Sequence, residues 1–242
     1  MMKLRFMLIA LIASMTLSVA DEAPKPRTGT LLSVEGDTAV TDIADIPVGV
    51  SGIVIHRYDK SHAAIVASVM VTQSDSAQSR HELLPYKGLE QPRLPTVKTR
   101  PIAGDRVILG YMYDRVLPIV PNQKSLEKAK KSFPYLNIIH PDLVAAELAK
   151  EKSPLPNRKV LQHTCEKFDL GLVMIMFADR TDFLDCISWT RLKTSSIKAD
   201  DPDQFKQPFF HRFDALPTAF YDWSEYKMQS FDKFYARLEK KE

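Results

Sequence analysis

The sequence PVGVSGIVIHRYDKSHAAIVASVMV, residues 47–71, decides the fold of the N-terminal half. Two apolar runs rich in Val and Ile, 50–55 and 63–71, flank a polar segment that contains no glycine. β-branched residues favour a pleated, half-buried surface, and a connection without glycine is longer than a two-residue turn. Gly49 and Gly52 within a strand pattern indicate a bulge or a close backbone approach. We therefore predict a β-hairpin at the centre of a small barrel.

Further short strands are expected on both sides of this hairpin. Residues 29–41 alternate apolar and polar side chains around Gly36 and Asp37, which predicts a second hairpin or a bent strand pair. The run RVILGYMY, residues 106–113, predicts a closing strand. Short strands with turn signals and no helical pattern between them are typical of a small barrel, which we expect over residues 29–115.

In the second half of the chain, segments with the apolar spacing of strands alternate with segments that have the apolar spacing of helices. Strands that alternate with helices indicate an α/β layer, expected here over residues 116–192. The expected elements are a strand at 116–120, a helix at 121–132, a strand at 137–139, a helix from Pro141 or Asp142 to Lys150, a helix at 157–168, a strand at 170–177, a turn at 179–182 and a strand at 183–189.

The last part of the chain combines a polar segment with an amphipathic one. Residues 193–221 are predicted to be a loop or linker with an acidic centre. Residues 222–242 carry apolar side chains at spacings near three and four, which predicts a C-terminal helix. The expected fold class is therefore mixed α+β, with a small β-barrel, an α/β domain and a C-terminal helix.

The first 20 residues have the features of a secretory signal peptide. Lys3 and Arg5 precede an apolar run, and residues 18–20 (SVA) are typical of a cleavage site. The run is shorter than the roughly 20 apolar residues that span a bilayer, and no longer run follows. We expect export, a tether at 21–28 and no transmembrane segment after cleavage. The cleaved chain would be nearly neutral, so no nucleic-acid partner is expected.

The two cysteines, Cys165 and Cys186, both lie in the exported part of the chain. Export permits a disulfide, and only one intramolecular pairing exists. Closing a loop of this length would stabilise the fold by about 3 kcal/mol. Cys165 falls on an expected helix and Cys186 on an expected strand, so two buried thiols remain an equal alternative.

The sequence contains no recognisable reaction centre. The 242 residues contain neither the G-x-S-x-G motif of a hydrolase nucleophile nor the G-x-x-x-x-G-K-S motif of a phosphate-binding loop. They also lack the G-x-G-x-x-G motif of dinucleotide-binding proteins and the H-E-x-x-H motif of zinc proteases. His56, His62 and His140 lack the tight spacing of a four-ligand metal site. His163 and Cys165 are two residues apart, so their side chains do not face each other on a helix. We expect no catalytic residue, cofactor or metal.

Acidic residues near the expected helices are assigned structural roles. Asp142, two residues after His140, is expected to cap a helix N-terminus. Asp200, Asp201 and Asp203 lack the glycine and glutamate that complete a calcium loop, which predicts a solvated acidic loop.

Three stretches carry a resemblance to a known family. The hairpin at 47–71, GDRVILGYMYDRVLPIVPNQ at 104–123 and FPYLNIIHPDLVAAEL at 133–148, together with the signal peptide, resemble the N-terminal domain of the plasminogen-binding protein A/B family of Gram-negative bacteria. The resemblance covers residues 29–189. It implies an exported protein of the periplasm, cell surface or outer membrane, without known catalytic residues.

The resemblance also implies a partner and its contact residues. Members of this family are linked to capture of host plasminogen through lysines at or near the C-terminus, whose ammonium groups kringle domains bind. The corresponding residues here are Lys240 and Lys241, which precede Glu242 and would act as internal lysines or be exposed by trimming. The alternative is a periplasmic scaffold or assembly component of an envelope or motility complex, whose partners would be the subunits of that complex.

Overall fold

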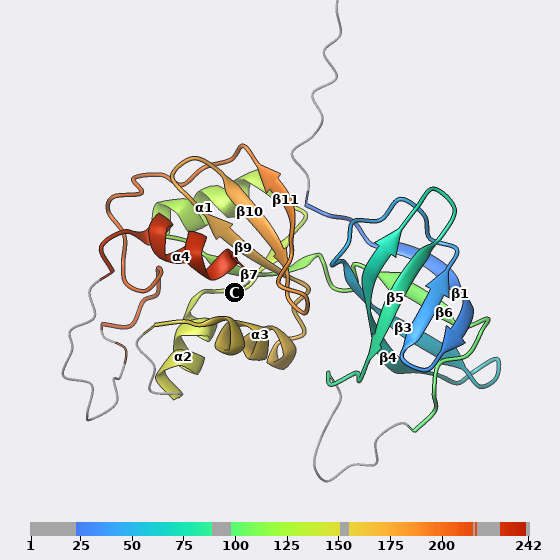
Figure 1. The fold of residues 1–242 in the computed structure, drawn as a ribbon. Helices are drawn as coiled ribbons and strands as arrows, with labels where there is room; N and C mark the ends of the chain where they lie inside the picture. The colour runs from blue at the N-terminus through green and yellow to red at the C-terminus, as the bar shows by residue number, and fades with distance from the viewer. Residues whose placement is uncertain (1–22, 89–97, 151–154, 215, 217–227, 241–242) are drawn as a thin grey trace, which may run out of the picture.

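The computed structural model describes residues 23–88, 98–150, 155–214, 216 and 228–240. It contains a β-barrel beside an α/β layer, with a short helix near the C-terminus packed on that layer (Figure 1). The mixed α+β class predicted from the sequence is confirmed. The predicted signal peptide at 1–20 lies outside the described residues. None of the described helices is long and apolar enough to cross a bilayer.

The barrel closes through six antiparallel strands in the order β1-β2-β5-β4-β3-β6. Its strands are β1 Arg27–Glu35, β2 Thr38–Thr41, β3 Ser51–Arg57, β4 Ala63–Ser74, β5 Ser79–Leu84 and β6 Arg106–Leu109. The β3–β4 pair is the hairpin predicted at 47–71, with a bulge between Val54 and Ile55. A Cβ at Gly52 would lie 2.3 Å from the Ile108 carbonyl oxygen, so the close backbone approach expected at this glycine is present.

The second sheet has the order β11-β10-β9-β7-β8. Strands β8 and β9 pair with β7 in parallel, whereas β10 and β11 are antiparallel to their neighbours. Its elements are β7 Arg115–Ile119, α1 Gln123–Ser132, β8 Asn137–Ile138, α2 Asp142–Lys150, α3 Arg158–Lys167, β9 Leu172–Met176, β10 Thr181–Asp185, β11 Arg191–Ser195 and α4 Phe231–Glu239.

Strand β9 separates two groups of buried side chains. Leu172, Met174 and Met176 belong to a group that includes α1 and the barrel interior. Val173 and Ile175 point to the opposite face, where they join residues of α2, α3 and α4. Because side chains alternate along a strand, one apolar run supplies both faces of the sheet. The first group is continuous from barrel to sheet, which fixes one unit against the other.

Two boundaries differ from the sequence prediction. The expected strand at 106–113 ends at Leu109, because Gly110 turns the chain with φ +70°. Strand β10 begins at Thr181, within the expected turn. Asp182 is tolerated there, fully buried, since its carboxylate accepts hydrogen bonds from Arg180 Nε at 2.6 Å and Thr194 Oγ1 at 2.5 Å.

Two further corrections concern the C-terminal part. Strand β11 lies at the start of the expected linker, where it forms an edge of the second sheet. The expected helix at 222–242 begins only at Phe231, after Ser230, whose Oγ caps it by accepting the Lys233 backbone N–H at 3.3 Å. Residues 217–227 lie outside the described part of the chain.

Candidate functional site

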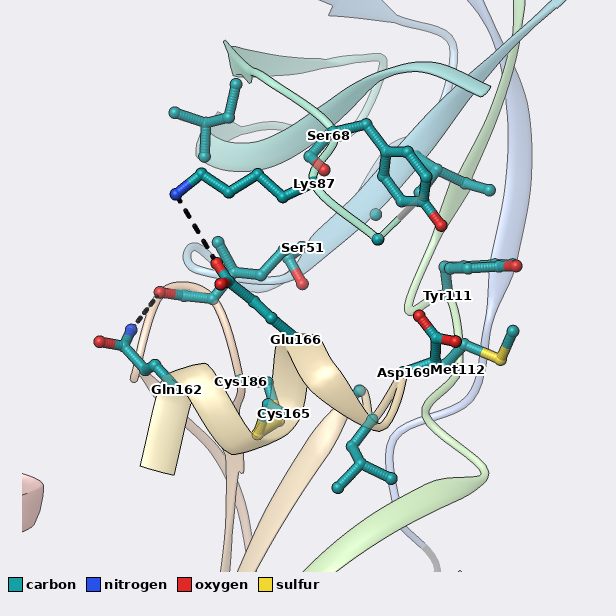
Figure 2. Close-up of a pocket in the computed structure, with 18 of the residues that line it drawn as sticks. Ser51, Ser68, Lys87, Tyr111, Met112, Gln162, Cys165, Glu166, Asp169 and Cys186 are labelled. Atoms are coloured by element: carbon teal, nitrogen blue, oxygen red, sulfur yellow. Dashed lines mark hydrogen bonds and ion pairs between the residues drawn. A yellow bond between two sulfur atoms is a disulfide. The ribbon is translucent and has the colours of Figure 1, made fainter. Parts of the chain in front are cut away.

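A cleft of about 320 Å³ lies between the barrel and α3 (Figure 2). We call it the α3 cleft, because the last turn of that helix forms one wall. The barrel, the segment after β5 and the connection to β7 supply the others. Its lining residues are 51–53, 68, 84–88, 111–112, 162, 165–166, 169–171 and 186–187.

The barrel wall of the cleft is a row of outward-facing side chains. Ile53 on β3 is paired with Ser68 on β4, which is paired in turn with Leu84 on β5. The residues beside Ser68, Ala67 and Val69, belong to the barrel core. Ser68 is only 5% exposed, and among the described residues none makes a hydrogen bond to its hydroxyl. The hydroxyl is not among the fully buried side-chain atoms that lack a partner, so this polar group is accessible from the cleft.

The mouth of the cleft gathers acidic and aromatic side chains. Asp169 follows α3 with a left-handed backbone, φ +50°, and its carboxylate lies close to Gly88. Burial raises the pKa of the Tyr86 phenol, and the neighbouring Tyr111 and Asp169 raise it further. On the other side of the mouth, Lys87 Nζ lies 3.9 Å from Glu166 Oε1.

A disulfide stabilises the α3 wall. Cys165 on α3 is joined to Cys186, just after β10, with 6.0 Å between the two Cα atoms. Both residues are buried. Gln162 Nε2 adds a hydrogen bond of 2.7 Å to the Ile187 carbonyl oxygen. The helix is thereby held to the turn that follows β10.

Asp185, at the end of β10, connects that turn to the barrel. Its Oδ2 accepts hydrogen bonds from Ser51 N at 3.0 Å, Ser51 Oγ at 2.5 Å and Tyr113 OH at 2.6 Å. Its Oδ1 accepts from the backbone N–H groups of Ile187 at 2.8 Å and Ser188 at 2.7 Å. Burial raises the pKa of this carboxyl, and the donors partly oppose the rise. The sequence signal for such a residue is an acid within the apolar run FLDCISW.

The histidines singled out in the sequence do not converge. Each of three pairs with a nearby group: His56 Nδ1 donates to Asp105 at 2.7 Å, His62 Nδ1 to Asp59 at 2.7 Å, and His140 Nδ1 accepts from the Asp142 backbone N–H at 3.2 Å. His163 is exposed, whereas Cys165 is buried. Within the described ranges, no three His, Cys, Asp or Glu side chains are placed to hold a metal ion.

Among the acidic residues, Asp142 differs from the expectation that its carboxylate caps a helix. Asp142 is the first residue of α2, but its carboxylate accepts hydrogen bonds from Arg212 N at 2.8 Å and Arg212 Nε at 2.6 Å instead of from the helix. Asp200 and Asp201 form ion pairs of 2.6 and 2.7 Å with lysines of α1. Asp203 is exposed.

Helix α4 carries a row of cations that ends at Lys240. Lys233, Arg237 and Lys240 follow a spacing of four and three residues, and all three are exposed. No side chain in the described part of the chain forms an ion pair with them. Glu239 faces the other way, 3.8 Å from Arg180 and from Arg191, and burial raises its pKa to about 7, with Asp182 adding to the rise. Lys241 lies outside the described residues.

Comparisons with known proteins place the chain in a family. Residues 28–238 match the family described as "Plasminogen-binding protein pgbA N-terminal". Two curated proteins named Plasminogen-binding protein PgbA, from two strains of Helicobacter pylori, are each 20% identical over 200 residues. These alignments cover 82% of this chain, but 44% and 43% of the relatives, so the chain spans less than half of their length. The chain therefore belongs to the family of plasminogen-binding protein PgbA N-terminal regions.

Proposed function

We propose that this protein is an exported, non-catalytic component of a bacterial cell envelope that binds a partner protein, and that plasminogen is that partner. Family membership over residues 28–238 supports a binding role of this type. Because the chain spans less than half of the relatives named for plasminogen binding, their activity is carried over here as part of the proposal.

The cationic row on α4 is the observation that carries the proposal. Lysine-dependent recognition needs an ammonium group that no acid of the same protein neutralises. Lys233 and Lys240 meet this condition among the described residues, since the nearby acid Glu239 is held by Arg180 and Arg191. Lys241 is the next residue in the sequence and lies outside the described part of the chain.

Binding of the purified protein to immobilised plasminogen, measured by surface plasmon resonance, tests this function. We expect binding that the soluble lysine analogue aminohexanoate abolishes. Replacement of Lys240 and Lys241 by Gln should weaken it strongly. The matched control replaces Lys130 and Lys131, an exposed lysine pair at the end of α1, by Gln and should leave binding unchanged. Equal losses in both variants, or binding insensitive to the analogue, would contradict the proposal.

An envelope scaffold is the second candidate function. The continuous core between barrel and sheet, together with the hydrogen bond of 2.6 Å from Ser188 Oγ to the Gly49 carbonyl oxygen, makes the two units a fixed pair of surfaces. Such a pair suits an adaptor. Crosslinking in intact cells followed by purification tests it, because a scaffold is recovered in a stable complex with envelope subunits, whereas a plasminogen receptor need not be.

Export and surface location need their own measurement. N-terminal sequencing of the protein from cell fractions should give a start at Asp21 if the signal peptide is removed as expected. Digestion of whole cells by an added protease then separates a surface protein, which is degraded, from a periplasmic one, which is protected. A protein that keeps residues 1–20 and stays in the cytoplasm would contradict the proposed location.

A further inference from the structure

The α3 cleft has the size and composition of a small-molecule site. Its volume of about 320 Å³ lies at the lower end of the range for such sites, about 300 to 1,000 Å³. Its lining includes the apolar side chains of Ile53, Leu84, Met112, Leu170 and Ile187. An aliphatic chain would find favourable contacts along these side chains.

The Ser68 hydroxyl offers a hydrogen-bonding group on the barrel wall of the cleft. The residue is 5% exposed, no described residue makes a hydrogen bond to its hydroxyl, and that hydroxyl is not among the fully buried atoms without a partner, so it remains accessible from the cleft. An accessible hydroxyl that the protein leaves unpaired binds water or a polar group of a ligand. The pairing of Ser68 with Ile53 and Leu84 directs it outward from the barrel and into the cleft (Figure 2).

The mouth of the cleft favours positive charge. The Asp169 carboxylate makes no ion pair within the described structure, and Glu166 has only the 3.9 Å contact with Lys87. Both acids lie at the C-terminal end of α3, where the helix dipole is negative. The rings of Tyr86 and Tyr111 offer aromatic faces that also attract cations.

We infer that the α3 cleft binds a small amphipathic cation, with an ammonium group at Asp169, an aliphatic chain in the middle and a hydrogen-bonding group at Ser68. This site is separate from the cationic row on α4, so it does not depend on plasminogen binding. The ammonium could belong to a free amine or to a lysine side chain of a peptide. Both sources share the chemistry that the cleft recognises.

Isothermal titration calorimetry, which measures the affinity of the protein for four probes of equal chain length, tests the inference. Aminohexanol carries both polar ends, hexylamine only the ammonium, hexanol only the hydroxyl, and hexanoate the opposite charge. We expect aminohexanol to bind about fivefold more tightly than hexylamine, the worth of one neutral hydrogen bond. Hexanol should bind more weakly, and hexanoate not at all. A capped lysine amide, titrated in competition, distinguishes a peptide source from a free amine.

Two variants test whether Ser68 binds the hydroxyl of the probe and Asp169 binds its ammonium group. Ser68→Ala should remove the advantage of aminohexanol over hexylamine while hexylamine binding persists, which also shows that the variant is folded. Asp169→Asn should weaken both amines about two- to fivefold and leave hexanol unchanged. Asp179→Asn, at an acid whose side chain is 71% exposed and which does not line the cleft, is the matched control. Absence of amine binding to the wild-type protein, equal affinity for hexanoate and hexylamine, or unchanged affinities in both variants would overturn the inference.

Discussion

Replacement of Asp185 by Ala should destabilise the whole protein by about 4 kcal/mol. The change leaves two buried hydroxyl donors, Ser51 Oγ and Tyr113 OH, without their acceptor, and each orphaned donor costs about 1 to 3 kcal/mol. The Ser51 backbone N–H keeps a weaker partner, the Tyr113 oxygen at 3.3 Å. The amides of Ile187 and Ser188 lie nearer to solvent, since Ile187 is 40% exposed, so water can replace the carboxylate there.

Urea unfolding followed by circular dichroism measures this loss. The matched control is Asp179→Ala, which removes an acid that is 71% exposed and lies 3.2 Å from Arg180. An exposed ion pair is worth at most about 1 kcal/mol, so the control should unfold close to the wild type. Because Asp185 joins the barrel to the second sheet, the variant should also lose stability in both units together.

Tyr113→Phe separates the contribution of one donor. It removes the phenol but keeps the ring and the Ser51 hydrogen bonds, so we expect a loss of about 1 kcal/mol. If Asp185→Ala costs no more than the Asp179 control, or if Tyr113→Phe costs as much as Asp185→Ala, the reasoning from the buried hydrogen bonds is refuted.

Three further predictions concern single structural features. Replacing Cys165 and Cys186 together by Ala should lower the free energy of unfolding by about 3 kcal/mol, and the reduced wild-type protein should match the variant in urea unfolding. Burial lowers the pKa of His81 to about 4, below the unfolded value of 6.5, so protonation favours the unfolded state. Stability should then fall by up to about 3 kcal/mol as pH decreases from 6.5 to 4, a slope that His81→Gln removes when unfolding is measured across this range. Gly49→Ala should cost more than Gly36→Ala in thermal unfolding, because both have a positive φ but only the Cβ at Gly49 would meet a side chain, at 2.4 Å; equal costs would contradict this.

Local patterns explain how much of the fold is predictable from the sequence. The hairpin at 47–71 and the helix α1 carry their own signals, β-branched runs in one case and Asn122 ahead of a periodic segment in the other. Strand β11 escapes prediction because RLKTS lies at a sheet edge and keeps polar side chains toward solvent. The sequence predicts a turn at Asp182, because an aspartate is typical of turns and its hydrogen-bonding partner Thr194, 12 positions away, is not visible in the local pattern.

Local sequence patterns cannot predict the α3 cleft. Its lining comes from segments between residues 51 and 187, and Ser68 or Asp169 alone resembles any other polar residue on a strand or after a helix. Only the docking of the barrel against α3 brings them together. The family resemblance, in contrast, points to Lys240, and the structure adds that Lys233 and Arg237 precede it on α4 at spacings of four and three residues.

Closure of the barrel has a consequence for self-association. Strand addition between protein copies requires an open sheet edge, and of the strands that the structure describes only β8 and β11 flank the second sheet as edges. β8 has two residues, and β11 carries the charges of Arg191 and Lys193. A fibril would have to grow from one of these two short or charged edges, so the folded protein should remain resistant to amyloid-type stacking even at high local concentration.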